Sequence, residues 1–279
     1  MTGRTHDTAT GTVTVHDQGA HLTEWRVGEV PVIWVSQASE YAVGTPIRGG
    51  VPVCWPWFGP GRGGDLTPAH GFARIAPWRL LEESTEDGTV RLLWELTPAD
   101  VAATDGAQHF PHAFTARVEV TVSESATISL TVRNDDTEPW DFEAALHTYL
   151  HVGDIRRVRL TGLEGTRYFD KVLQSEGSQE GQLSFSGETD RVYRAEGAVQ
   201  VHDPVFDRTL VIEKAGSANT VVWNPWVDKA AAMSDFQDGE WPVMVCVEAA
   251  SVGDDAVRLE PGAEHTLSTT VQIRPLDQS

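Results

Sequence analysis

Two polar side chains lie within apolar stretches of the sequence, where burial would suit them to proton transfer. Glu248 follows the apolar run VMVCV (243–247), and His147 lies within the alternating segment 142–151. Histidine has an ordinary pKa of about 6.5 and burial raises the pKa of a carboxyl, so both groups can exchange protons at neutral pH. For His147 the residues alone favour a solvated strand face. For Glu248 they leave open a strand's exit into solvent or a poorly hydrated site.

The segment 46–79, PIRGGVPVCWPWFGPGRGGDLTPAHGFARIAPWR, is a basic region in an acidic chain. Its four arginines and single acid, Asp65, give it a formal charge of +3, whereas the whole chain carries −20. Its glycines admit positive φ and its prolines remove backbone donors, so we expect a loop system. Arg48 and Arg74 stand near glycines, and guanidinium forks suit phosphate oxygens, which predicts an anion site. The alternatives are pairing with some of the 41 acids, or a tryptophan-rich loop that only packs.

Motifs for metals and cofactors are weak or absent in the sequence. His109 and His112 form an isolated H-x-x-H, whereas a structural zinc usually takes four protein ligands. Cys54 and Cys246 have no Cys-x-x-Cys partner, and we find no P-loop, dinucleotide fingerprint or G-x-S-x-G elbow. We therefore expect neither a metal nor a cofactor.

The bulk composition limits the partners of the protein. The 41 acidic residues against 21 basic ones argue against nucleic acid and anionic membranes. The first residues, MTGRTHDTATG, lack the apolar core of a signal peptide, and no run is apolar and long enough to span a membrane. Two cysteines indicate no disulfide framework. We expect a cytoplasmic monomer that acts on a small molecule, without nucleic-acid or membrane partners.

Strands must position these side chains, because period-2 alternation recurs along most of the chain. Segments 114–122 and 127–132 predict a hairpin, and 142–151 predicts one strand. On that strand one face is expected to carry Phe142, Ala144, Leu146, Thr148 and Leu150, and the other Glu143, Ala145, His147, Tyr149 and His151. Further strands are expected at 12–15, 28–35, 91–96, 157–163, 191–193, 209–213, 219–223, 243–248 and 266–273, and a helix at 227–236.

This pattern predicts a single all-β domain over residues 1–279, built as a large antiparallel sandwich of two sheets with very little helix. Residues 1–11 are polar and are expected to be disordered. His147 and Glu248 lie far apart in the sequence, so only the fold can bring them together.

Six motifs occur in one order between residues 46 and 250: IRGGVPVCWPWFG, HGFAR, ALHTYLHV, LEGTRYFDK, VVWNPW and VCVEAA. In this respect the chain resembles the D-hexose-6-phosphate mutarotase branch of the aldose 1-epimerase superfamily. The pairing of RGG with HGFAR is the feature that separates this branch from the mutarotases of free sugars. One departure is Ala69, where the family often has glutamine before the histidine of HGFAR, so sugar preference can differ.

The resemblance implies the galactose mutarotase-like supersandwich and an isomerase that interconverts the α and β anomers of a hexose 6-phosphate, with glucose 6-phosphate as the first candidate. It implies that His147 and Glu248 are catalytic, Glu248 as base and protonated His147 as acid when the ring opens. It implies that Arg48, His70, Arg74 and Asp170 bind substrate, with no metal or cofactor. The alternatives are an epimerase of unphosphorylated sugars and a non-catalytic carbohydrate-binding protein on the same fold.

Overall fold

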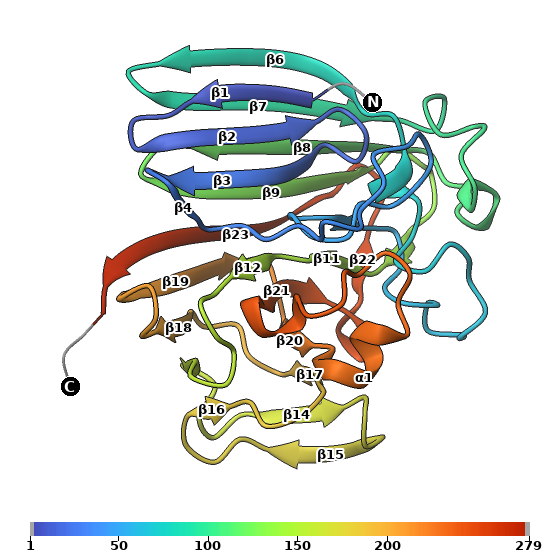
Figure 1. The fold of residues 1–279 in the computed structure, drawn as a ribbon. Coiled ribbons are helices and arrows are strands. Elements are labelled where there is room, and N and C mark those ends of the chain that lie inside the picture. Colours follow the sequence, from blue (N-terminus) through green and yellow to red (C-terminus); the bar gives the residue numbers. More distant parts are fainter. Residues whose placement is uncertain (1–2, 277–279) are drawn as a thin grey trace.

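The computed structural model describes residues 3–276 and consists mainly of antiparallel strands, which confirms the predicted fold class (Figure 1). The largest sheet has nine strands and includes the predicted hairpin of β8 and β9. In sheet order the strands are β16 (Leu183–Ser184), β13 (Arg159–Thr161), β18 (Val199–Asp203), β19 (Arg208–Ala215), β23 (Glu264–Pro275), β9 (Ser125–Asn134), β8 (Phe114–Val122), β7 (Thr89–Leu96) and β6 (Arg79–Glu86).

A second sheet of eight strands packs against the first. Its order is β15 (Ser175–Ser178), β14 (Arg167–Asp170), β17 (Thr189–Tyr193), β20 (Asn219–Asn224), β21 (Met244–Ser251), β11 (Ala144–Leu146) and β5 (Val53–Cys54), and β12 (Tyr149–His151) also pairs with β21. In Figure 1, β23 runs through the middle of the molecule, between β6 to β9 above and the strands of the second sheet below. It contacts β11 and β21, so the two sheets share one interface.

Two smaller sheets complete the architecture. One contains β1 (Gly3–Asp7), β2 (Gly11–His16), β3 (His21–Val27) and β4 (Val30–Pro31), and the other pairs β10 (Trp140–Phe142) with β22 (Val257–Leu259). The predicted disorder of residues 1–11 is wrong for residues 3–11. β1 pairs with β2 over five residues, and Arg4 binds the carboxylates of Asp17 and Glu83. Met1 and Thr2 lie outside the described residues.

The main hydrophobic core lies between the two large sheets. β8 and β9 alternate buried and more exposed residues, as a sheet with one covered face requires. The second sheet contributes the side chains of Val222, Val245 and Val247 to this core. Its opposite face is covered as well, by separate apolar clusters that include Cys54, Tyr149 and Cys246. This opposite face is the place where polar side chains can be held away from water, and it is called the site face below.

Helical structure is sparse. The one α-helix, α1 (Trp226–Ala231), is shorter than the predicted 227–236, because the chain leaves helical geometry after Ala232. Short 3₁₀ turns lie at η1 (Ala73–Ile75), η2 (Ala107–His109), η3 (Trp241–Val243) and η4 (Gly253–Asp255). Within residues 3–276, none of these helices is both long and apolar enough to cross a membrane.

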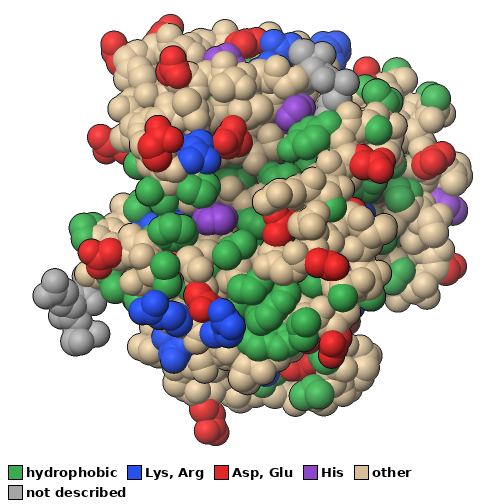
Figure 2. Space-filling model, viewed as in Figure 1, with side chains coloured by type: hydrophobic (Ala, Val, Ile, Leu, Met, Phe, Trp, Pro, Cys, Tyr) green, Lys and Arg blue, Asp and Glu red, His purple; other side chains and the backbone are tan. Residues whose placement is uncertain are grey.

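The segment 46–79 is largely loop, as its composition predicts, and it wraps the end of the second sheet. Only the short strand β5 joins that sheet, at its edge beside β11. Figure 2 shows acidic side chains scattered over the visible face of the molecule rather than gathered in one patch. On this face the negative charge is therefore spread out and does not mark a site.

Candidate active site

Strand pairing places Glu248 on the site face. Residues directly opposite each other in antiparallel strands project to the same side of the sheet. Glu248 pairs with Val221, and Cys246, two residues earlier, pairs with both Trp223 and Tyr149. Val245 and Val247, which alternate with them, lie in the core. The alternation predicted for this segment is confirmed, and of the two interpretations of Glu248 the poorly hydrated one is correct, since only 1% of the residue is exposed.

His147 contacts Glu248 directly, with 3.4 Å between its Nε2 and Oε1 of Glu248. Its ring lies parallel to that of Tyr149, with the centroids 4.6 Å apart, and the edge of Trp223 faces it. The solvated strand face favoured for His147 is therefore wrong, because the residue is only 7% exposed. Within the described part of the chain, His147 Nδ1 and Glu248 Oε2 are buried without a hydrogen-bond partner. The pair therefore keeps polar atoms free for a ligand.

The backbone around His147 is irregular, which corrects the prediction of one continuous strand over 142–151. The chain breaks between β10, β11 and β12, although the predicted division into two faces holds. The amide of Glu143 donates to Pro56 O, and that of His147 donates to Pro52 O. These bonds tie both breaks to the loop 46–79, so the loop fixes the position of the histidine.

Burial controls the protonation of the pair. It lowers the pKa of His147 well below its ordinary value, and the nearby His70 lowers it further. Burial also raises the pKa of Glu248 well above the usual range, and the negative charge of Asp190 adds to this, while Lys171 opposes it. In the free protein both effects favour the uncharged forms, with neutral imidazole and protonated carboxyl. Of the two protons that this pair can lose by titration, it then holds one, on Glu248.

Arg48 is anchored at the site by two partners. Its Nη1 donates to the hydroxyl of Tyr149 at 3.0 Å, and its Nη2 lies 2.9 Å from a carboxylate oxygen of Asp235. Burial alone would lower the pKa of Arg48, but its contacts with Tyr149 and Asp235 outweigh burial and raise that pKa above its ordinary value, so the guanidinium stays charged. Burial also raises the pKa of Tyr149 above its ordinary value. The ion pair considered as an alternative for this arginine is thus present, and it also orients the guanidinium beside the catalytic candidates.

His70 and Arg74 come from the loop that covers the site. His70 has a positive φ of 68°, its Nδ1 accepts a hydrogen bond from Gly59 N, and its ring centroid lies 5.7 Å from that of His147. Arg74 donates from Nη2 to the carbonyl of Ala69 at 2.6 Å. Among residues 3–276 no carboxylate lies within ion-pair distance of Arg74, and its buried Nε has no partner. Arg74 is half-buried, and a cation without a carboxylate partner is suited to bind an anion.

The other two arginines of the segment 46–79 leave the site. Arg62 pairs with Asp141, and Arg79 lies in β6 and pairs with Glu95 on the larger sheet. Only half of the four arginines that made the segment basic therefore bear on the site.

Asp170 is the one predicted site residue that the structure places apart from the others. It pairs across the sheet with Arg191, whose own partner is Val222 of the core, so it projects to the face opposite Glu248. Its carboxylate accepts hydrogen bonds from Val172 N and Leu173 N and binds Arg191 Nε at 3.0 Å. These bonds stabilise a turn and leave the carboxylate little capacity for a sugar.

Asp190 is the aspartate on the site face, and the sequence analysis missed it. It pairs with Trp223, which pairs with Cys246, and its Oδ2 lies 3.3 Å from Lys171 Nζ. Its negative charge contributes to the raised pKa of Glu248. Asp190 and Val192 are two residues apart in β17, so they project to the same face, and Val192 packs on the site face.

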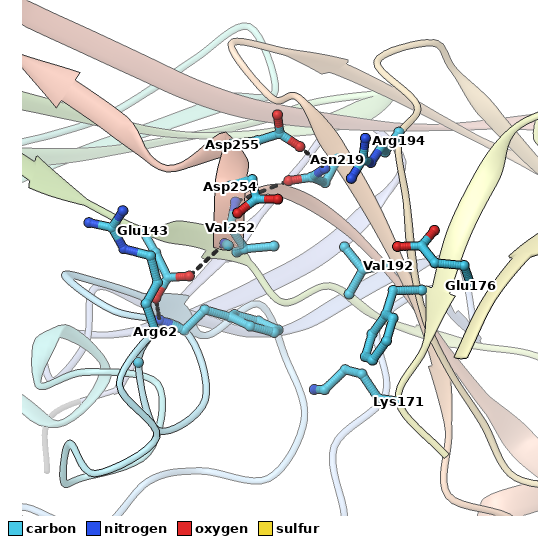
Figure 3. A pocket seen from close by; sticks show the side chains of 14 residues that line it. Arg62, Glu143, Lys171, Glu176, Val192, Arg194, Asn219, Val252, Asp254 and Asp255 are labelled. Atoms are coloured by element: carbon cyan, nitrogen blue, oxygen red, sulfur yellow. Dashed lines mark hydrogen bonds between the residues drawn. The ribbon is translucent and has the colours of Figure 1, made fainter. Parts of the chain in front are cut away.

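A pocket of about 490 Å³ lies beside β14 and β17, and neither His147 nor Glu248 lines it. Figure 3 shows Arg62 and Glu143 on one side of it and Lys171, Glu176 and Val192 on the other. Lys171 links the pocket to the site through its contact with Asp190. Glu143 is held by the amides of the loop and of η4, since its carboxylate accepts from Phe58 N and Gly253 N.

A metal ion could be held at one place among the described residues, where donor atoms of His147, Cys246 and Glu248 lie close together. The H-x-x-H pair considered in the sequence is not such a group: His112 binds Asp136, and His109 contacts Gln108. Both cysteines are free and buried.

Comparisons with known proteins identify relatives of the chain in sequence and in fold. Residues 4–272 match the family model described as aldose 1-epimerase. A protein of Salmonella typhimurium strain LT2, provisionally named glucose-6-phosphate 1-epimerase, is 37% identical over 235 residues, which cover 83% of this chain and 76% of that protein. An Escherichia coli K12 protein with the same provisional name is 37% identical over 237 residues, covering 84% and 77%. The crystal structure of a Salmonella typhimurium protein, provisionally described as a mutarotase, superposes with a TM-score of 0.87 at 33% identity, covering 97% of this chain and 90% of that one.

Proposed function

Because the chain belongs to the aldose 1-epimerase family, we propose that it interconverts the α and β anomers of a hexose 6-phosphate by acid–base catalysed ring opening and closure. The observation that carries the proposal is the buried contact of His147 with Glu248, in which each residue retains an unpartnered polar atom. Anomer exchange needs two proton transfers, one at the C1 hydroxyl and one at the ring oxygen O5, and two adjacent proton carriers supply them.

The proposed reaction moves one proton in each direction. Glu248 removes the proton from the C1 hydroxyl while His147 donates a proton to the ring oxygen O5, and the C1–O5 bond breaks to give the open-chain aldehyde. Rotation about C1–C2 then presents the other face of the carbonyl. His147 takes back the proton of the O5 hydroxyl as O5 attacks C1, and Glu248 returns its proton to O1. Each positioned transfer contributes about 10²–10⁴-fold.

The protonation expected at the start of opening differs from the one that burial favours in the free protein. The free pair carries its proton on Glu248, whereas opening requires it on His147. The two arrangements differ by a single transfer across the 3.4 Å contact. The negative charge of a bound phosphate favours the protonated imidazole, so substrate binding can drive this transfer. The active pair therefore contains one proton in total.

Substrate recognition is proposed to come from charged groups around the pair. Arg74 lacks a carboxylate partner in the described chain and is the first candidate for the phosphate, with Arg48 beside it. His70, whose Nδ1 accepts from the backbone, keeps Nε2–H as a donor for a sugar hydroxyl. Asp190 takes the hydroxyl-binding role that the resemblance gave to Asp170. All of these residues belong to one chain, so the proposed site needs no partner subunit, and we propose a cytoplasmic monomer.

The substrate class is tested by comparing glucose 6-phosphate with glucose, using exchange NMR of the anomeric protons in Arg74→Met, Arg48→Met and the control Arg79→Met. A hydrogen bond to a charged group contributes about 1.5–3 kcal/mol, so each site variant should lose about 10- to 100-fold in kcat/KM for the phosphosugar. The rate with glucose and the Arg79 control should change little. If both site variants keep full phosphosugar activity, the phosphate assignment fails. If the wild type accelerates neither sugar yet binds both, the protein is a carbohydrate-binding protein.

A further inference from the structure

We propose that His147, Cys246 and Glu248 form a binding site for a thiophilic divalent cation such as Zn²⁺, which occupies the place of the sugar. The three residues supply one imidazole nitrogen, one thiol sulfur and one carboxylate oxygen, and these donor atoms all lie within 4.8 Å of one another. All three residues are buried. The mechanism proposed above uses the histidine and the glutamate but gives the thiol no task.

The sheet geometry explains why the donors converge. Cys246 and Glu248 are separated by one residue in β21, so both project from the site face. Cys246 pairs with Tyr149 of β12, and the ring of His147 stacks on that tyrosine. The histidine is thereby held beside Cys246 and Glu248. This arrangement follows from strand register, and a rearrangement of the fold is not needed to create it.

The chemistry of the donors fits zinc. Zinc sites that exchange ligands commonly have three protein ligands drawn from Cys, His and carboxylate, with a fourth position open. At bond lengths of about 2.0–2.3 Å, two ligands of a tetrahedral ion lie about 3.3–3.8 Å apart. The His147–Glu248 separation of 3.4 Å already has this value. The third donor needs to close by about 1 Å, which a small rotation of the side chains provides.

Unsatisfied polar atoms give a second, independent reason for a ligand here. His147 Nδ1 and Glu248 Oε2 are buried without a partner within residues 3–276, although the two residues are only 7% and 1% exposed. Buried polar atoms normally have partners, and an isolated buried carboxylate is costly. A divalent cation held by His147 Nε2 and Glu248 would neutralise the thiolate and the carboxylate, to which the unpartnered Oε2 belongs. Because the sugar needs the same histidine and glutamate, cation and sugar exclude each other.

The binding test uses the two cysteines as a matched pair of variants. Cys54 is the other buried free thiol of the chain and lies outside the donor group, so Cys54→Ala is the control for Cys246→Ala. Metal-free protein is dialysed against Zn²⁺ and its metal content is measured, and Co²⁺ is added separately to look for the near-ultraviolet thiolate-to-cobalt band. We expect one ion per chain and the cobalt band in the wild type and in Cys54→Ala, with at least tenfold weaker binding and no band in Cys246→Ala. Zinc bound equally well by Cys246→Ala, or wild-type protein without the band, overturns the proposal, and Cys246→Ser repeats the test if the alanine variant does not fold.

The inhibition arm rests on the proposed function, whereas the binding arm does not. Zn²⁺ should inhibit anomer exchange of glucose 6-phosphate competitively in the wild type and in Cys54→Ala. In Cys246→Ala the same Zn²⁺ concentrations should leave most of that variant's own activity. Non-competitive inhibition, or equal sensitivity of both variants, contradicts a shared site. If Zn²⁺ and Co²⁺ bind through Cys246 but no sugar phosphate is turned over, the metal site stands and the proposed function fails.

Discussion

Replacing Glu248 with glutamine should lower catalytic activity while it leaves stability unchanged or increases it. The amide has nearly the size of the carboxyl and can keep the 3.4 Å contact with His147, but it cannot take the proton of the C1 hydroxyl. Losing one positioned proton transfer costs about 10²–10⁴-fold in rate, or about 2.7–5.5 kcal/mol of barrier at 1.36 kcal/mol per tenfold. We therefore expect kcat to fall by at least 100-fold.

The same substitution should leave the fold unchanged or more stable. Burial raises the pKa of Glu248, so the folded protein holds this proton at pH values where the unfolded chain releases it. Stability contributed by such a group is present at low pH and decreases as the pH rises above the ordinary pKa of glutamate and through the raised one. Glutamine has no such dependence, so the melting temperature of Glu248→Gln should equal or exceed that of the wild type at neutral and alkaline pH.

The assay is exchange NMR between the anomeric protons of glucose 6-phosphate, with the spontaneous rate subtracted and thermal melts recorded on the same samples. Glu213→Gln on the exposed side of β19 is the matched control, because it makes the same chemical change outside the second sheet. A Glu248→Gln enzyme within threefold of the wild type would refute the role of this carboxyl. Activity lost together with a lowered melting temperature would show instead that the carboxylate is structural.

Two further predictions follow from the charges and the backbone around the site. Asp190→Asn removes a charge that raises the pKa of Glu248, so the alkaline limb of the pH–rate profile should move to lower pH. Lys171→Met removes a charge that lowers this pKa, so it should move the same limb to higher pH. Limbs that stay in place in both variants, or that move in the same direction, would contradict a catalytic pair that holds one proton. Gly71→Ala forces a side chain at a φ of +75° and places Cβ 2.1 Å from a main-chain oxygen, so unfolding free energy should drop by at least about 1–3 kcal/mol, seen in denaturant melts. Gly64→Ala, with φ of +79° but open space around it, is its control and should cost less.

Much of the fold and the central pair could be predicted from the sequence, because alternation reports faces directly. Within 244–247, Val245 and Val247 lie in the core and Met244 and Cys246 on the site face, as their spacing predicts, whereas Val243 packs with the site-face cluster. Alternation could not show that the site face is itself covered. That cover comes from the loop 46–79 and from helix α1, which lie far from His147 in the sequence, so a histidine that reads as solvated is buried.

The net charge of the segment 46–79 indicated an anion site but could not show which of its arginines bind the anion. A sum over the segment counts Arg62 and Arg79, which pair with acids elsewhere, equally with Arg48 and Arg74. What distinguishes Arg74 is the lack of any carboxylate partner in the described chain, and partners are set by tertiary contacts. The sequence could therefore indicate an anion site but could not select the arginine.

Strand register places the side chains of Asp170 and Asp190 on opposite faces of the second sheet. Asp170 and Asp190 lie on adjacent strands of the same sheet and differ by one step in register. Asp170 is opposite Arg191, and Asp190 is the residue beside that arginine, so period 2 sends the two carboxylates to opposite faces. A motif such as YFDK identifies the sequence neighbours of Asp170, but it does not show whether Asp170 projects to the same face of the sheet as Glu248. If Asp170→Ala lowers the melting temperature while the KM for glucose 6-phosphate holds, and Asp190→Ala raises KM while the melting temperature holds, the register has assigned the roles correctly. The reverse result would mean that the turn held by Asp170 reaches the sugar after all.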